Sequence, residues 1–239
     1  YVAKHPLLIF KDVWGRWGVM GEFDIKLMGG CGKPVVYLYP EKTIDIHLSF
    51  TSPLTLNTQI PFYNNGWFVQ ADPDGRLLDL QPQYTDCAKI DSSKFGSEYA
   101  VNACKTNNYP YIYWSGKSLQ NPYPKVDGGW IIEKNNLQKF MDEKLKEIGL
   151  TKKESADMTS YWVPKMIEKN TPYYQISFLK TNQMNEFVPM NVNPVPNSVL
   201  RIFLDYKALN TKPSVIPKPQ QFNKFIRNGF TLVEWGGLQ

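Results

Sequence analysis

The strongest apolar pattern in the chain is KPVVYLYPE at residues 33–41, where β-branched and aromatic side chains follow one another between two prolines. A short continuous apolar run bounded by such breakers is typical of a strand buried on both faces, and Pro40 predicts its end. Residues 44–50 then alternate apolar and polar side chains, which predicts a strand with one exposed face. We expect the rest of the chain to add strands to this pair.

The same patterns recur along the chain, separated by turn sequences. Asn-Asn-Gly at residues 64–66 and Asp-Pro-Asp-Gly at residues 72–75 are typical of tight turns, because Asn and Gly tolerate positive φ. Turns between short apolar runs favour antiparallel sheets. We predict a mainly β fold, an antiparallel β-sandwich-like domain, with further strands at 54–58, 67–71, 76–80, 109–116, 128–132, 173–179, 199–206 and 229–237.

The periodicity changes to that of helices over about residues 135–168. Asn135 can cap a helix whose apolar stripe (Leu137, Phe140, Met141, Leu145 and Ile148) ends at Gly149. Thr151 and Glu154 form a capping-box pattern that predicts the start of a second helix, and Pro164 predicts a kink or a new turn in it. We interpret the segment as an inserted α-helical hairpin that packs its stripes on the sheet.

Glycines divide the chain into two parts. Gly29, Gly30 and Gly32 predict a flexible or sharply turned link, because glycine adopts backbone angles closed to other residues. We therefore assign residues 1–32 to an N-terminal extension or docked strand pair, and residues 33–239 to a β-rich domain with the helical insertion 135–168. No signal-peptide pattern opens the chain at Tyr1, so we interpret it as a processed product or as part of a longer protein.

Composition narrows the class of protein. Apolar residues make up 42% of the 239 residues and charged residues 21%, which is neither a disordered nor a membrane composition. No run approaches the roughly 18 apolar residues of a membrane-spanning helix, so we expect no transmembrane segment. The net charge of +5 is spread along the chain, and we interpret it as a solvated basic face with no nucleic-acid partner.

Two of the three cysteines bracket a polar segment. A disulfide between Cys87 and Cys104 would close a loop of the size that stabilises a fold by about 3 kcal/mol. We predict this disulfide, with two free thiols as the alternative, and with it an oxidising compartment. Cys31 is then unpaired, and it either bridges to a partner outside this chain or is a small buried residue.

Six short segments of the chain are landmarks by their order and spacing. They are KPVVYLYPE after Gly32, the turns at 63–67 and 73–75, the segments 113–116 and 161–166, and the C-terminal GFTLVEWGG strand at 229–237. In their order and spacing these landmarks resemble a widespread family of uncharacterised microbial proteins over roughly residues 31–238. The resemblance implies a shared fold, and it implies no activity.

No motif of metal or cofactor chemistry appears in the sequence. His5 and His47 are the only histidines, and no cysteine or histidine pair has the spacing of zinc ligands, so we expect no metal and no cofactor. Two carboxylates are the candidate catalytic residues: Glu41, after the buried strand, and Glu234, in the last apolar strand. The alternative is that Glu41 caps a turn and Glu234 pairs with a basic residue such as Arg201.

Aromatic side chains are the candidate binding residues. Five tryptophans lie next to Gly, Tyr or Pro: Trp67, Trp114, Trp130, Trp162 and Trp235. Exposed together, such rings stack on sugars or anchor a protein partner, whereas singly they more often belong to the core. We predict binding through Trp67, Trp114, Trp235 and Tyr113.

These features favour an extracellular or cell-surface, non-catalytic binding or structural module, as a subunit of a surface assembly. The expected partner is a protein or further copies of this chain, with carbohydrate as the alternative ligand. The competing hypothesis is a secreted, glycosidase-like hydrolase that uses Glu41 and Glu234, and it requires one cleft to contain both carboxylates.

Overall fold

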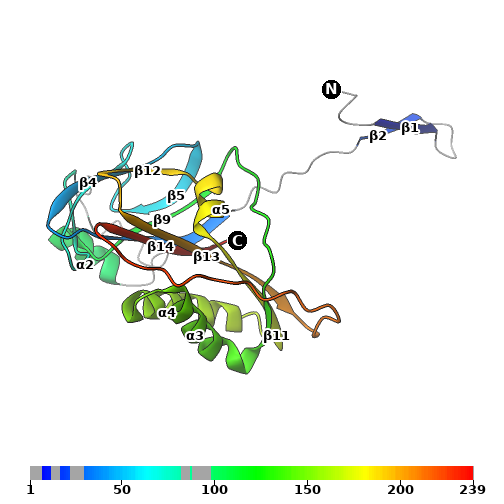
Figure 1. Ribbon diagram of the computed structural model, residues 1–239. Helices are drawn as coiled ribbons and strands as arrows, with labels where there is room; N and C mark the ends of the chain where they lie inside the picture. Colours follow the sequence, from blue (N-terminus) through cyan, green and yellow to red (C-terminus); the bar gives the residue numbers. More distant parts are fainter. Residues whose placement is uncertain (1–6, 12–16, 22–29, 82–86, 88–97, 239) are drawn as a thin grey trace.

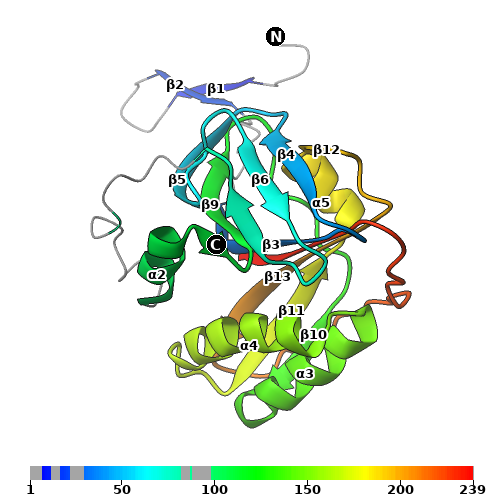
Figure 2. The same cartoon turned by 90° about the vertical axis from the view of Figure 1, so that its left-hand side faces the viewer.

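The computed structural model describes residues 7–11, 17–21, 30–81, 87 and 98–238. It confirms the mainly β fold: a seven-stranded and a five-stranded sheet, largely antiparallel, lie face to face. Two helices, α3 and α4, cover the other face of the larger sheet (Figures 1 and 2). The described residues from Gly30 onward therefore form three layers: a sheet, a second sheet and the helices.

The seven-stranded sheet is the middle layer. Its order is β10-β11-β13-β14-β3-β9-β5, and every neighbouring pair is antiparallel except β13 and β14, which are parallel. The strands are β10 (Trp130–Glu133), β11 (Tyr173–Leu179), β13 (Ser198–Leu209), β14 (Thr231–Leu238), β3 (Gly30–Tyr39), β9 (Ile112–Ser118) and β5 (Leu54–Ile60).

The five-stranded sheet forms an outer layer with the order β12-β4-β6-β7-β8. Its strands are β12 (Met190–Asn193), β4 (Ile44–Phe50), β6 (Trp67–Ala71), β7 (Leu77–Asp79) and β8 (Asn108–Tyr109). In the N-terminal part, β1 (Leu7–Lys11) and β2 (Trp17–Gly21) form an antiparallel pair of their own. Asn65 and Gly66 have positive φ before β6, as the turn prediction requires.

Strand β3 lies between the two cores, which explains its continuous apolar run. Val36 and Leu38 are buried between the sheets, whereas Val35 and Tyr37 are buried against the helices. A strand covered on both faces has no polar side to alternate with. Its partner β14 pairs with it from Thr231 opposite Tyr39 to Trp235 opposite Val35.

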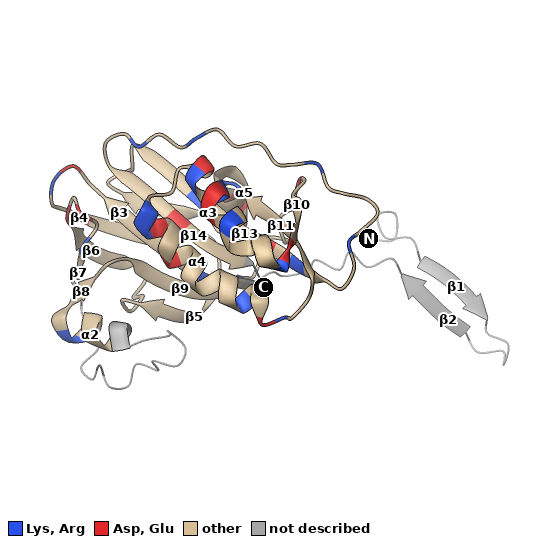
Figure 3. Ribbon diagram, turned by 90° about the horizontal axis from the view of Figure 1, so that it is seen from below, with Lys and Arg blue, Asp and Glu red and all other residues tan. Residues whose placement is uncertain are grey.

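The predicted helical hairpin is present as α3 (Leu137–Ile148) and α4 (Lys152–Ile167). Gly149 ends α3 with φ 112°, and Thr151 and Glu154 make the predicted capping box at the start of α4. The cap of α3 is Asn136 and not Asn135, because a 3-10 turn (Lys134–Asn136) precedes it. Helix α4 continues for three residues beyond Pro164. Charges of both signs line the two helices (Figure 3).

Three elements are absent from the sequence predictions. They are α2 (Glu98–Thr106), α5 (Thr181–Phe187) and β12, which lie in segments for which the sequence analysis predicts no helix or strand. Helix α5 buries only Met184 and Phe187, so its sequence carries too little apolar periodicity to reveal a helix. Strand β12 is a four-residue edge strand that forms through its pairing with β4.

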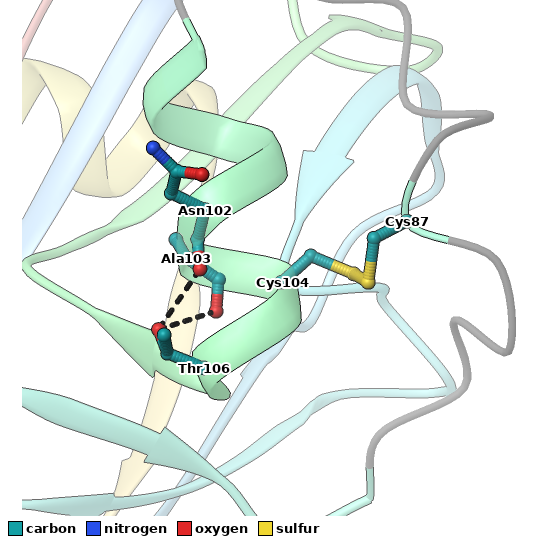
Figure 4. Close-up of a disulfide and its surroundings, with 5 residues drawn as sticks. All are labelled: Cys87, Asn102, Ala103, Cys104 and Thr106. Carbon is teal, nitrogen blue, oxygen red and sulfur yellow. Dashed lines mark hydrogen bonds between the residues drawn. A yellow bond between two sulfur atoms is a disulfide. The ribbon is translucent and has the colours of Figure 1, made fainter.

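The predicted disulfide between Cys87 and Cys104 is formed (Figure 4). Cys104 lies on α2, where Thr106 Oγ1 donates to the carbonyl oxygens of Asn102 and Ala103 in the last turn. The bond ties this helix to the segment that precedes it. Cys31 is free and buried, in agreement with the simpler of its two interpretations.

The helices of the described part of the chain are all too short or too polar to cross a membrane.

Candidate functional site

A bulge in β3 places a lysine at the edge of the helical layer. Between Cys31 and Val35, three residues of β3 lie opposite two residues of β9, so the strand carries one extra residue. Lys33 is in this bulge, with φ 43°. A left-handed backbone is unfavourable for a lysine, and bulges of this kind re-aim a side chain out of the regular alternation. The Lys33 side chain reaches Tyr161 of α4.

Lys33 lines a groove between the sheet and α4. The groove has a volume of about 490 Å³, a floor made by β3, β9 and β5, and a wall made by α4. We call it the lysine groove, because three of its lining residues are lysines. It is lined by Cys31, Gly32, Lys33, Asn57, Thr58, Tyr113, Ser115, Gly116, Lys117, Tyr161 and Lys165.

Tyr161 holds two of the three lysines together. The Lys33 ammonium nitrogen lies 4.0 Å from the centre of the Tyr161 ring, within the range of a cation–π interaction. Lys165 Nζ donates to Tyr161 Oη at 3.1 Å, since residues four apart on a helix are neighbours. One side chain of α4 thus fixes two ammonium groups on the same side of the groove.

The groove contains positive charge that no acidic side chain among its lining residues neutralises. Burial lowers the pKa of Lys33; Asp157 raises it in part, and Lys165 lowers it further. Asp157 already accepts hydrogen bonds from Tyr37 Oη at 2.8 Å and from Lys153 Nζ at 2.9 Å. Its carboxylate is therefore occupied outside the groove.

Tyr113, one of the predicted binding residues, lies in this groove. Its side chain is half-buried, and burial together with the neighbouring Tyr161 and Tyr111 raises its pKa. The phenol therefore stays protonated at neutral pH. It offers the groove an apolar ring with a polar tip, the combination that suits a binding surface.

The three predicted tryptophans lie elsewhere, and their prediction as surface binding residues is corrected by their burial. Trp67, Trp114 and Trp235 are 1%, 0% and 1% exposed. Their indole N–H groups donate to Pro61 O at 2.8 Å, to Glu234 Oε1 at 2.9 Å and to Tyr37 Oη at 3.3 Å, respectively. These rings belong to the core, because each has an apolar environment and an internal hydrogen-bond partner.

Of the other two tryptophans, Trp162 is buried on α4 and Trp130 is half-buried beside Phe140. These five tryptophans therefore share no exposed patch, and the carbohydrate alternative loses the basis that they gave it.

Glu41 and Glu234 do not share a cleft, which corrects their prediction as a catalytic pair. Glu234 is fully buried, whereas Glu41 is exposed in the turn after β3. Glu234 pairs with Val36 in the middle of the sheet, whereas Glu41 lies in the bend beyond the end of β3 at Tyr39. Two glycosidase carboxyls lie about 5–10 Å apart across the same opening.

Glu234 instead makes a buried ion pair with Arg201, as the alternative interpretation has it. Arg201 Nε donates to Glu234 Oε2 at 2.6 Å across the parallel strands β13 and β14. Arg201 Nη1 also donates to the carbonyl oxygens of Met184 and Val188 at 3.0 and 2.8 Å. The pair therefore attaches the α5 segment to the sheet.

In the described part of the chain, no three His, Cys, Asp or Glu side chains are grouped as metal ligands. His47 stacks on Phe68 at 4.1 Å, and His5 lies outside the described residues. Burial, with the nearby Glu234 carboxylate, raises the pKa of the Cys31 thiol. The thiol therefore stays protonated and is a poor nucleophile.

No family model, no curated protein and no solved structure matches this chain. The resemblance to a microbial family over residues 31–238 therefore stays a prediction.

Sequence reasoning missed Lys33, Lys117, Lys165 and Tyr161. Their one visible signal is the Tyr161–Lys165 spacing of four residues, which puts both on one face of α4. Lys33 has no such signal, because in the sequence it is only the residue before an apolar run. The bulge that sets the direction of its side chain depends on the pairing of β3 with β9.

Proposed function

We propose that this chain is a non-catalytic binding module of an extracellular or cell-surface protein, and that the lysine groove holds an anionic group of its partner. The observation that carries the proposal is the grouping of Lys33, Lys117 and Lys165 in one groove. Lys33 and Lys165 are partly buried and repel one another, Lys117 is exposed at the same groove, and a bound anion would remove the repulsion.

The groove also has the neutral groups that a bound carboxylate, sulfate or phosphate needs. Asn57, Thr58 and Ser115 supply amide and hydroxyl groups from β5 and β9, and Tyr113 supplies an aromatic wall. A few polar groups that converge in a largely preformed concavity are typical of ligand sites.

Two further observations support the setting of this proposal. The disulfide between Cys87 and Cys104 favours an oxidising compartment. The proposal that the module is non-catalytic is supported by Glu234. Its carboxylate was a candidate catalytic group, but it is buried and held by Arg201 and Trp114.

The experiment is a calorimetric titration of the full chain at about 50 mM salt with citrate, pyrophosphate and poly-L-glutamate as separate probes. We expect at least one probe to bind, with an affinity that falls as salt rises, because salt screens charges at such distances. The variant Lys33→Gly/Lys117→Gln/Lys165→Gln should lose at least about tenfold in affinity, equivalent to about 1.4 kcal/mol.

The matched control removes three exposed lysines outside the groove, Lys139→Gln/Lys207→Gln/Lys212→Gln, and so lowers the net charge by the same amount. Its affinity should stay within about twofold of the parent, since it leaves the groove intact. Absence of binding by all three probes, or an equal loss in both variants, would overturn the proposal.

A further inference from the structure

Strand β5 is an edge strand of unusual character. It ends the seven-stranded sheet, and its seven residues (Leu54–Ile60) contain no charge and no proline. The other sheet edges in the described part of the chain are shorter: β10 and β12 have four residues each, and β8 has two. Long edges are usually blunted by charge, proline or brevity, because an open edge accepts another strand.

The backbone of β5 is oriented to accept such a strand. Leu119 N–H donates to Pro53 O at 3.2 Å, next to the pairing of Thr55 with Lys117. Since backbone groups alternate along an antiparallel pair, Leu54 and Leu56 direct their N–H and C=O groups away from β9. These groups lie on the side of β5 where the sheet ends.

The edge adjoins the lysine groove. Asn57 and Thr58 belong both to β5 and to the groove lining, and Lys117 pairs directly with Thr55. A strand added to β5 would lie about 10 Å from β9, two strand spacings, which an extended Lys and an extended Glu can bridge between them. Alternate side chains of that strand would face the groove.

We infer that β5 is a docking edge for an extended acidic segment of a partner protein, which adds as a strand while its alternate carboxylates face the lysine groove and meet Lys117 of β9. Backbone hydrogen bonds supply affinity in this mode and the side chains supply specificity. Uncharged strand and positive groove together select a segment that is extended and negative. This inference rests on the proposed function and names the class of partner.

The experiment uses the full chain and a blocked octapeptide of alternating threonine and glutamate, with two matched analogues. One analogue is methylated on every backbone nitrogen and keeps all carboxylates; the other has glutamine in place of glutamate. We expect the parent peptide to bind and each analogue to lose at least about tenfold. Amide hydrogen exchange at Leu54 and Leu56 should slow on binding, because these amides become hydrogen-bonded.

The outcomes separate this inference from the proposed function. Equal binding of the methylated analogue, with unchanged exchange at Leu54 and Leu56, would overturn strand addition and leave the anion-binding groove intact. Failure of the parent peptide to bind while citrate or pyrophosphate binds would do the same. Equal binding of the glutamine analogue would instead refute the role of the lysines.

Discussion

The positive charges of Arg201 and Lys33 have opposite surroundings. Arg201 is 2% exposed, and its guanidinium donates to Glu234 and to carbonyl oxygens of the α5 segment. Lys33 lies in a strained bulge, shares Tyr161 with Lys165, and faces no acid among the groove lining. The Arg201 charge is balanced by a carboxylate within the fold and is structural, whereas Lys33 and Lys165 share only the neutral Tyr161 side chain inside the groove.

The largest expected effect concerns the buried pair. Glu234→Leu should lower the free energy of unfolding by about 3–5 kcal/mol, because it leaves the Arg201 charge buried without its carboxylate. Urea denaturation of parent and variant measures the difference. Adding Arg201→Met should recover much of the loss; a single variant within 1 kcal/mol of the parent would show that the pair does not hold the fold.

Removal of the disulfide should lower the stability of the fold and leave anion binding in the lysine groove unchanged. Cys87→Ser/Cys104→Ser should lower the free energy of unfolding by about 3 kcal/mol, because the unfolded chain regains the freedom of that loop. Neither cysteine lines the lysine groove, so poly-L-glutamate should bind with unchanged affinity. A parallel loss of affinity would mean that the α2 region shapes the groove.

Replacing Lys33 in the bulge should weaken anion binding and leave the stability of the fold nearly unchanged. Lys33→Gly removes the ammonium group and relieves the left-handed backbone, so the free energy of unfolding should stay within about 1 kcal/mol of the parent. Affinity for poly-L-glutamate should fall about two- to fivefold, by the loss of one ion contact. A stability loss as large as that of Glu234→Leu would make Lys33 a structural residue.

The smallest expected effect is a pH dependence, in which the stability of the fold and the affinity for anions change in opposite directions. The lowered pKa of Lys33 means that the folded state releases this proton at lower pH than the unfolded chain. As pH rises from that pKa toward 10.5, the Lys33 contribution to stability becomes more favourable while its contribution to anion binding disappears. The free energy of unfolding and the affinity for poly-L-glutamate should be measured between pH 7 and 10 for the parent and for Lys33→Gly. The difference between the two proteins gives the Lys33 contribution at each pH. The same pH dependence in both proteins would contradict this prediction.

The predictable parts of the fold are those whose pattern is local. The run in β3 and the capping box of α4 identify a strand and a helix start directly, because each follows from neighbouring residues. The pairing of Glu234 with Arg201 could be named as an alternative, since both lie in apolar strands. Helix α5 could not be predicted, because tertiary contacts and not periodicity hold it.

Most of the candidate site could not be predicted from the sequence, because it too depends on tertiary contacts. Tyr113 could be named because an aromatic side chain in a strand is a general signal for binding or core. The groove itself arises where β3, β9, β5 and α4 meet, and the position of Lys33 depends on a register shift between strands far apart in sequence. No single stretch of sequence contains that information.

The most direct test of the account is ¹³C NMR of the full chain with dimethylated lysines, which keep their positive charge, during titration with poly-L-glutamate at low salt. The account predicts that the signals of Lys33, Lys117 and Lys165 move together, with one saturable midpoint, while those of Lys139, Lys207 and Lys212 stay in place. Equal movement of all six signals, or movement confined to the lysines outside the groove, would contradict it.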